Sequence, residues 1–217
     1  MQIVIVPVTA FKQNCSVVWC SETMKAGVVD PGGDVDQIIS VIEDHRVSVE
    51  KILITHGHVD HAGGASELAE RLDVPIEGPH RDDDFWLRQL PEQTVQFNLP
   101  ESKSFVPDRW LDEGDIISIG NVSFRVFHCP GHTPGHVIFY EPEGNIAFVG
   151  DVLFQGSIGR TDFPRGNHQD LLASITQKLW PLGNDVRFFP GHGVTSTFGD
   201  ERKNNPFVAD NIIAFAS

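Results

Sequence analysis

Long apolar runs, disulfide-forming cysteines and an excess of basic residues are all missing from this chain. No apolar stretch reaches the ~18 residues that a membrane-spanning helix needs, and the first residues lack the basic segment of a signal peptide. Three cysteines are too few, and odd in number, for a disulfide framework. We therefore expect a cytoplasmic protein with no membrane partner.

The charge balance is acidic, with 16 lysines and arginines against 30 aspartates and glutamates and a net charge of −14. Binding to a nucleic-acid backbone depends on clustered basic residues, so this balance argues against nucleic-acid partners. With 217 residues, of which 40% are hydrophobic, the chain can bury a full core. We expect one domain over residues 1–217.

Strand and helix patterns alternate along the chain and divide it into two similar halves, about 1–114 and 115–205, followed by a short C-terminal segment. In the first half we expect strands at 3–8, 16–19, 26–29 and 51–55, with helices that begin after Asp34 as N-cap and near residue 65. In the second half we expect strands at 115–119, 121–128, 137–140, 146–149 and 186–189, and a helix around 171–179. Two such halves would pack sheet against sheet with helices outside.

The stretch between the halves, roughly residues 78–112, contains four prolines. Proline interrupts helices and sheets, so we expect mostly loop here. We expect one short helix there, at 84–90. We also expect the acidic run at 82–84 to be solvated.

The motif that says most about function follows the strand at 51–55. Residues 56–61 read HGHVDH, and their four potential metal ligands are His56, His58, Asp60 and His61. Imidazoles and carboxylates bind zinc, iron and manganese. Alternate side chains of an extended segment share a side, so we expect His56, His58 and Asp60 to point together and His61 to turn away where a helix begins. The motif therefore predicts a site for two metal ions.

Three further candidate ligands come at the ends of other predicted strands: His132, Asp151 and His192. Each alone would be an ordinary turn residue, and their common position is what predicts metal binding. Two metal ions about 3.5–4 Å apart can hold a bridging hydroxide and polarise a carbonyl. A thioester would suit such a site, because its departing thiolate needs little protonation and no dedicated general acid.

Several motifs beyond HGHVDH run almost from end to end: PVTAF at 7–11, DPGG at 30–33, CPGHTPGH at 129–136 and GRTDFPRG at 159–166. In these motifs the sequence resembles the metallo-β-lactamase superfamily, and within it the compact bacterial glyoxalase II-like hydrolases of the YcbL type. The resemblance implies an α/β (α+β) fold, arranged as a four-layer αββα sandwich.

The resemblance also implies a ligand assignment. A first metal ion would bind His56, His58 and His132, and a second Asp60, His61 and His192, with Asp151 bridging the two. Asp60 and Asp151 are thus the implied catalytic carboxylates. We expect two divalent ions, zinc before iron or manganese. The implied reaction is hydrolysis of S-D-lactoylglutathione to D-lactate and glutathione, which ends methylglyoxal detoxification.

Substrate contacts are less well defined by the resemblance. Longer glyoxalase II enzymes place a basic residue that contacts glutathione at the position of Arg160, but they have an aromatic residue where this chain has Asp162. Two roles are possible for Arg160: a contact to the substrate or an ion pair with Asp162. Phe163 is a candidate for the pocket wall, and His136 for a packing role beside the ligands. Those enzymes also use a C-terminal helical domain, for which too few residues follow His192.

Other functions remain open at this point. A persulfide dioxygenase would bind one iron through His56, His132 and Asp151, and a related metallohydrolase would act on another thioester or ester. Two other classes fit this chain less well. The zinc β-lactamases nearest to this pattern place cysteine at the position of Asp151, and flavodiiron proteins place glutamate at that of His58. RNA-processing relatives carry a large insertion that this chain lacks, which argues against that function. A non-catalytic metal-binding scaffold would be expected to show gaps in the ligand set, which is complete here.

Overall fold

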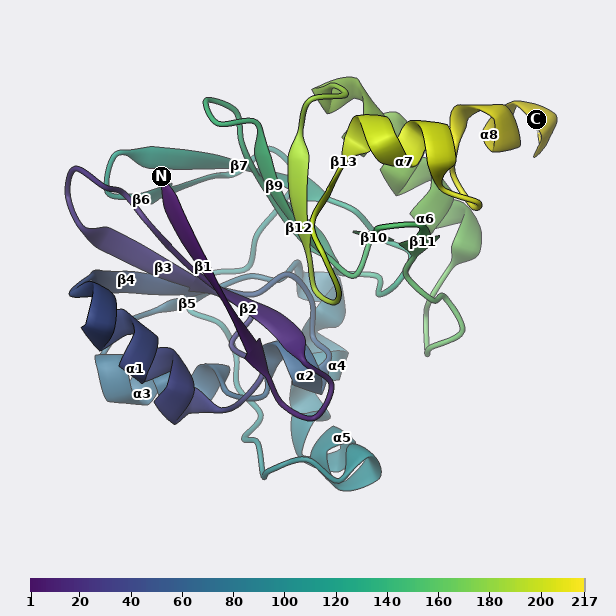
Figure 1. The fold of residues 1–217 in the computed structure, drawn as a ribbon. Coiled ribbons are helices and arrows are strands. Elements are labelled where there is room, and N and C mark those ends of the chain that lie inside the picture. Colours follow the sequence, from purple (N-terminus) through teal and green to yellow (C-terminus); the bar gives the residue numbers. More distant parts are fainter. Residues whose placement is uncertain (217) are drawn as a thin grey trace.

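The computed structural model describes the backbone of residues 1–216 and the side chains of residues 1–213, with two sheets between layers of helices (Figure 1). The first sheet has the order β1-β2-β3-β4-β5. Its strands are β1 (Gln2–Val8), β2 (Gln13–Trp19), β3 (Lys25–Val29), β4 (Ser48–Leu53) and β5 (Ile76–Glu77). β1, β2 and β3 pair antiparallel, whereas β3, β4 and β5 pair parallel, so the last three end at the same edge of the sheet.

The second sheet has the order β13-β12-β9-β8-β7-β6. Its strands are β6 (Ile116–Ile119), β7 (Val122–His128), β8 (Val137–Glu141), β9 (Ile146–Gly150), β12 (Arg187–Pro190) and β13 (Ser196–Thr197). Only the β9–β12 pair of this sheet is parallel among the described residues. A separate two-stranded ribbon is formed by β10 (Leu153–Phe154) and β11 (Ser157–Ile158).

Alternating side chains of the central strands divide the interior into three apolar cores. In β8, Val137 and Phe139 belong to a core that residues of both sheets share, whereas Ile138 belongs to a second core that includes Leu171 from a helix. The third core joins the outer face of the first sheet to its own helices. Because successive side chains of a strand point to opposite faces, each sheet has helices on one face and the other sheet on the second. The predicted four-layer αββα sandwich is therefore confirmed.

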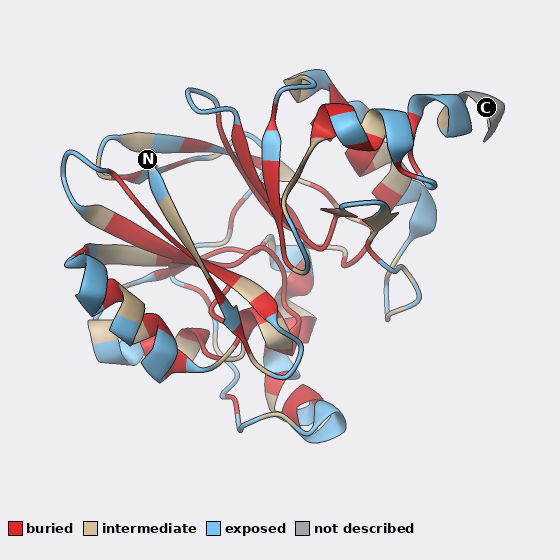
Figure 2. Cartoon of the chain, in the orientation of Figure 1, coloured by how far each residue is buried: buried red, intermediate tan, exposed pale blue. Residues whose placement is uncertain are grey.

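The outer layers consist of short amphipathic helices. α1 (Val35–His45) and α3 (Ala65–Leu72) cover the first sheet. The helices of the second sheet are α6 (His168–Ala173), η2 (Ser174–Leu179), η3 (Trp180–Leu182) and α7 (Phe198–Asn204), and α8 (Asp210–Ala216) follows. Figure 2 shows α1 and α7 carrying both buried and exposed faces. No helix within residues 1–216 combines the length and apolar character needed to cross a membrane.

Most expected strands and helices are confirmed to within a few residues, but the region 78–112 contains more helix than predicted. η1 (Arg81–Asp83), α4 (Asp84–Arg88) and α5 (Leu90–Phe97) follow one another there, where one helix and loops were expected. The prediction of loop was wrong at Pro91, because we expected this proline to interrupt a helix. Pro91 lies in the first turn of α5, where its missing N–H costs no hydrogen bond.

Asp34 is confirmed as the N-cap residue of α1, but its side chain does not cap the helix. Asp34 does precede α1, but its backbone is left-handed (φ 48°) and its side chain makes no capping hydrogen bond. Its carboxylate instead accepts the backbone N–H of Thr9 at 2.7 Å. Asp34 thus ties the loop between β1 and β2 to the start of α1.

Candidate metal centre and substrate cavity

The loop that carries His56 and His58 begins where β4 ends, and a buried carboxylate fixes its start. Asp30, just after the neighbouring β3, accepts hydrogen bonds from the backbone N–H of Thr55 at 2.7 Å and from its hydroxyl at 2.6 Å. Because β3 and β4 are parallel, their ends lie side by side and these contacts are short. Asp30 was not among the residues predicted for the site, although its place in DPGG directly after a strand was a usable signal.

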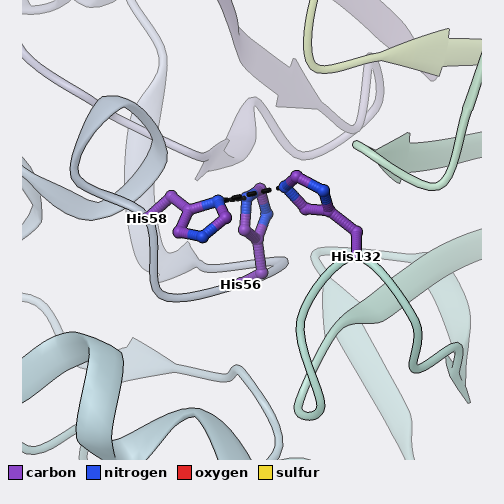
Figure 3. A group of neighbouring side chains, drawn as sticks. All are labelled: His56, His58 and His132. Carbon is purple, nitrogen blue, oxygen red and sulfur yellow. Dashed lines mark hydrogen bonds between the residues drawn. The ribbon is translucent and has the colours of Figure 1, made fainter. Parts of the chain in front are cut away.

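Three imidazole nitrogens meet at this edge of the two sheets. His58 Nδ1 lies 3.0 Å from His56 Nε2 and 3.0 Å from His132 Nε2 (Figure 3). His56 and His58 come from the loop after β4, and His132 from the loop after β7, so each sheet contributes to this first cluster. All three side chains are buried, with exposures of 7% or less.

Hydrogen bonds at the far side of the rings direct lone pairs into the first cluster. His132 Nδ1 lies 2.7 Å from the carbonyl oxygen of Arg160, which can only accept. His132 must therefore donate from Nδ1, and its Nε2 carries a lone pair. Burial lowers the pKa of His56 and His58 well below the usual value, so both rings are neutral at pH 7 and able to bind a cation.

A second cluster combines Asp60, His61 and His192. Asp60 Oδ2 lies 3.1 Å from His192 Nε2 and 3.8 Å from His61 Nε2. Asp60 and His61 both lie in α2 (Val59–Ala62), and His192 follows β12. The expectation that Asp60 continues an extended segment with His56 and His58 is wrong, because the chain becomes helical at Val59. The helix turns Asp60 and His61 together toward His192.

Asp151, which directly follows β9, contacts both clusters. Its Oδ1 lies 3.3 Å from His61 Nε2, and its Oδ2 lies 3.6 Å from His132 Nε2 and 3.7 Å from His192 Nε2. Its backbone N–H donates to His136 Nε2 at 3.0 Å, and the His136 ring stacks on His56 at 4.6 Å. His136 thus packs beside the clusters and orients Asp151.

The charges of the second cluster fit a cation. Burial lowers the pKa of His61, but Asp151 and Asp60 raise it more, so that its pKa lies well above the usual value. Its Nδ1 faces Asp30 at 2.9 Å, whereas its buried Nε2, 3.3 Å from Asp151 Oδ1, forms no hydrogen bond among the described residues. Asp151 Oδ1 is likewise buried without a hydrogen bond within residues 1–213. Buried charges require compensation, and a divalent cation among these atoms would supply it.

The structure places all seven sequence-predicted ligands around one centre. Groups of three with ligand atoms within 4.8 Å of one another include the set His56, His58 and His132 and the set Asp60, His61 and His192. The donors are imidazoles and carboxylates, the set that suits zinc, iron and manganese. The residues therefore fit bound metal ions.

A buried carboxylate that the sequence analysis misread joins the two histidine loops. Asp83 was expected in a solvated acidic run, but its side chain is fully buried. It accepts hydrogen bonds from the backbone N–H of Gly57 at 2.8 Å, from the hydroxyl of Thr133 at 2.8 Å and from the backbone N–H of Gly135 at 2.6 Å. A Cβ on Gly135 would lie 2.5 Å from the backbone nitrogen of Asp83, so only glycine allows this approach. The glycines beside the histidines were the available signal.

A cavity of about 420 Å³ opens beside the two clusters. His58, Asp60, His132 and Asp151 are among its lining residues. Aromatic side chains form much of the remaining wall: Phe11, Trp86, Phe97, Phe154 and Phe163. The volume falls within the range of roughly 300–1,000 Å³ that is usual for small-molecule sites.

Both sequence-predicted substrate residues line this cavity. The Phe163 ring lies 4.8 Å from the ring of His58. The guanidinium carbon of Arg160 lies 4.3 Å from the Phe163 ring centroid, and its Nε donates to Asp162 at 2.6 Å. The ion pair with Asp162 is therefore present, while Arg160 remains at the cavity wall.

Comparison with known proteins agrees with this architecture. The model of the metallo-beta-lactamase superfamily matches residues 8–192. The hydroxyacylglutathione hydrolase GloC of Haemophilus influenzae is 47% identical over 209 residues, which are 96% of this chain and 98% of that protein. An uncharacterized protein of Aquifex aeolicus is 37% identical, over 97% of this chain and 98% of its own.

Solved structures show the same fold. The B3 metallo-β-lactamase BLEG-1 superposes with a TM-score of 0.88 and 34% identity, covering 95% of this chain and 99% of its own. TTHA1623, solved in a di-iron-bound form, gives a TM-score of 0.86 and 35% identity, covering 94% of this chain and 100% of its own. Together with the ligand clusters, these matches show that the chain belongs to the metallo-β-lactamase superfamily and is one of its glyoxalase II-like hydrolases.

Proposed function

We propose that the protein is a dinuclear metal-dependent thioesterase whose substrate is S-D-lactoylglutathione. The observation that carries this proposal is the position of Asp151 between two complete ligand clusters at one end of a small-molecule cavity. The relation to the hydroxyacylglutathione hydrolase GloC supports the choice of substrate.

One divalent cation would be held by His56, His58 and His132. A second would be held by Asp60, His61 and His192, with Asp151 contacting both. Zinc is the first choice, and iron or manganese would suit the same donors. When bound, such cations lower the pKa of water from 15.7 to about 7 and withdraw charge from a carbonyl oxygen.

The residues around the clusters position the groups that hold the cations. Asp30 faces the Nδ1 of His61 at 2.9 Å, which directs Nε2 to the centre. The carbonyl of Arg160 does the same for His132, and His136 holds the backbone of Asp151. Contacts of this kind fix ring orientation and ligand basicity in metal sites.

The reaction itself demands little proton transfer to the leaving group. A thiol has a pKa near 8.5, so the glutathione thiolate can depart without a general acid. The aromatic wall that includes Trp86 and Phe163 would limit the access of bulk water to the thioester. Arg160, at the edge of the cavity, would pair with a carboxylate of glutathione in place of Asp162.

Three parallel assays test this function. Purified protein with measured metal content is incubated with S-D-lactoylglutathione while the thioester absorbance is followed. A parallel sample receives glutathione persulfide in an oxygen electrode, and a third receives a chromogenic β-lactam. We expect metal-dependent loss of the thioester, without oxygen uptake and without opening of the β-lactam.

Other outcomes would reject the proposal in different ways. Oxygen uptake with one iron per chain would make the protein a persulfide dioxygenase. Activity on the β-lactam alone would assign it the reaction of BLEG-1. Inactivity in all three assays by the metal-loaded protein would leave a metallohydrolase with another ester or thioester as its substrate.

A further inference from the structure

The polar side of the cavity is formed by one face of α5 and the residue before it. Gln89, Glu92 and Gln96 all line the cavity, at spacings of three and four residues. Residues at these spacings lie on the same side of a helix. Within residues 1–213, none of the three side chains makes a hydrogen bond or ion pair, so their polar groups are available to a ligand.

The position of α5 relative to the metal centre is fixed by Gln93 on the same helix. Gln93 Oε1 accepts the backbone N–H of Val59, the first residue of α2, at 2.9 Å, and its Nε2 donates to the carbonyl of Trp86 at 2.9 Å. Gln93 is buried, with 5% exposure. Figure 1 shows α5 below α2 and α4. The polar face is therefore held at a constant place relative to Asp60 and His61.

Glu92 differs from the other carboxylates of the cavity in its surroundings. The two other acidic residues in the lining, Asp60 and Asp151, face the histidines of the metal centre. The lining arginine, Arg160, pairs with Asp162. Glu92 is exposed and, within the described part of the chain, forms no ion pair. It is thus the negative charge that this wall presents to a substrate.

A glutathione thioester carries one group that matches this charge. Its γ-glutamyl end has an ammonium beside a carboxylate, and its glycyl end has a second carboxylate. The net charge of −14 on the protein repels the carboxylates at long range, whereas Glu92 attracts the ammonium. Glutamine side chains offer both donors and acceptors, which suit the peptide groups between the two ends.

We propose that the α5 face formed by Gln89, Glu92 and Gln96 binds the γ-glutamyl end of the substrate, with Glu92 paired to its ammonium. This inference rests on the proposed function, because it takes the substrate to be a glutathione thioester. An extended tripeptide spans about 10 Å, so its ends lie well away from the thioester. The contact would be the same in the ground state and the transition state, and it would therefore lower KM without changing kcat.

The test compares two ligands that differ only at the amine. S-hexylglutathione is a thioether that cannot be hydrolysed, and its N-acetyl derivative lacks the ammonium. Calorimetric titration of the metal-loaded protein measures the Kd of each ligand for the wild type, for Glu92→Gln and for the control Glu43→Gln. Glu43 lies exposed on α1, outside the cavity, and its substitution removes the same charge.

We expect Glu92→Gln to raise the Kd of S-hexylglutathione about threefold, as for a partly exposed ion pair. The Kd of the N-acetyl ligand should not change. Glu43→Gln should change neither. Equal changes for both ligands would overturn the assignment, because Glu92 would then not recognise the ammonium. Tighter binding to Glu92→Gln would overturn it as well, because Glu92 would then only repel the carboxylates. Failure of the wild type to bind S-hexylglutathione would overturn it as well.

Hydrolysis and binding separate this inference from the proposed function. If the wild type binds with the expected selectivity but hydrolyses no thioester, the α5 site stands and the thioesterase proposal fails. If the wild type hydrolyses S-D-lactoylglutathione but Glu92→Gln shows no amine-dependent loss of binding, the thioesterase proposal stands and the α5 site fails. In the active case, the KM of Glu92→Gln should rise about threefold with kcat unchanged.

Discussion

The carboxylate of Asp83 accepts the backbone N–H of Gly135 at 2.6 Å, and the same carboxylate accepts the backbone N–H of Gly57 at 2.8 Å. Gly57 stands between His56 and His58, and Gly135 lies three residues after His132. One buried side chain therefore connects the loop of the first sheet with the loop of the second. The spacing of the three imidazoles in the first cluster depends on this connection.

Replacing Asp83 with asparagine should weaken metal binding. An amide can accept at its oxygen, but its NH2 group would face one of the three donors that the carboxylate now satisfies, and the two loops would separate. We expect the metal affinity to fall about tenfold, the lower end of the range for residues that support ligands. Competition with a chromophoric chelator measures the affinity. Asp82→Asn, at an exposed neighbour, is the matched control, and an equal loss there would contradict the connecting role.

Asp83 should also make stability depend on pH. Burial raises the pKa of Asp83 to about 6, although its three donors lower it. The folded protein therefore binds this proton more tightly than the unfolded chain, whose Asp pKa is about 3.9. The resulting stability is present below about pH 4 and is lost as the pH rises through 6. For the metal-free protein, the free energy of unfolding of the wild type minus that of Asp83→Asn should fall by up to about 3 kcal/mol between pH 4 and 7. Denaturant titrations at several pH values measure it, and a rising difference would show that the ionised form is favoured.

Replacing Asp151 with alanine should remove most activity and lower the amount of bound metal. Both clusters lose a carboxylate oxygen at once, and with it several kcal/mol of charge stabilisation. We expect kcat/KM for S-D-lactoylglutathione to fall by about a hundredfold or more. Steady-state kinetics and metal analysis of the same preparation check this, with the exposed Asp185→Ala as the control. Unchanged turnover would rule out Asp151 as a bridging ligand.

Replacing Arg160 with alanine should raise KM more than it lowers kcat. Arg160 lines the cavity and is exposed, and a carboxylate of the substrate can compete with Asp162 for it. We expect a KM increase of about threefold, and a change in unfolding free energy below about 1 kcal/mol, because the existing ion pair is exposed. Arg125→Ala, on the exposed side of β7, controls for the loss of charge. A fall in kcat alone would show that Arg160 is not a simple binding contact.

Local patterns in the sequence indicated two sheets with helices outside, and the resemblance to the metallo-β-lactamase superfamily implied the four layers. In β8 the alternation of Val137, Ile138 and Phe139 assigns successive side chains to two different cores. The seven candidate ligands could also be found from the sequence, because each lies in the HGHVDH motif or in a loop that follows a strand. Strand ends of neighbouring strands meet at one edge, so their position along the chain already predicted that they would meet in space.

The errors came from residues whose role depends on distant partners. Asp83 belongs to an acidic run that is typical of a solvated surface, and only the folded chain places it beside Gly57 and Gly135. Pro91 is a helix breaker in general, yet it stands in the first turn of α5.

The sequence by itself determined which residues can bind metal ions and which segments form most of the strands and helices, because both follow from residue type and from local spacing. Tertiary structure alone decided that Asp30 and Asp83 hold the histidine loops, and that α5 carries a polar face on the cavity. These contacts join positions from 25 to 52 residues apart. A buried carboxylate must find donors to offset its loss of hydration, and which donors it finds depends on how the whole chain packs.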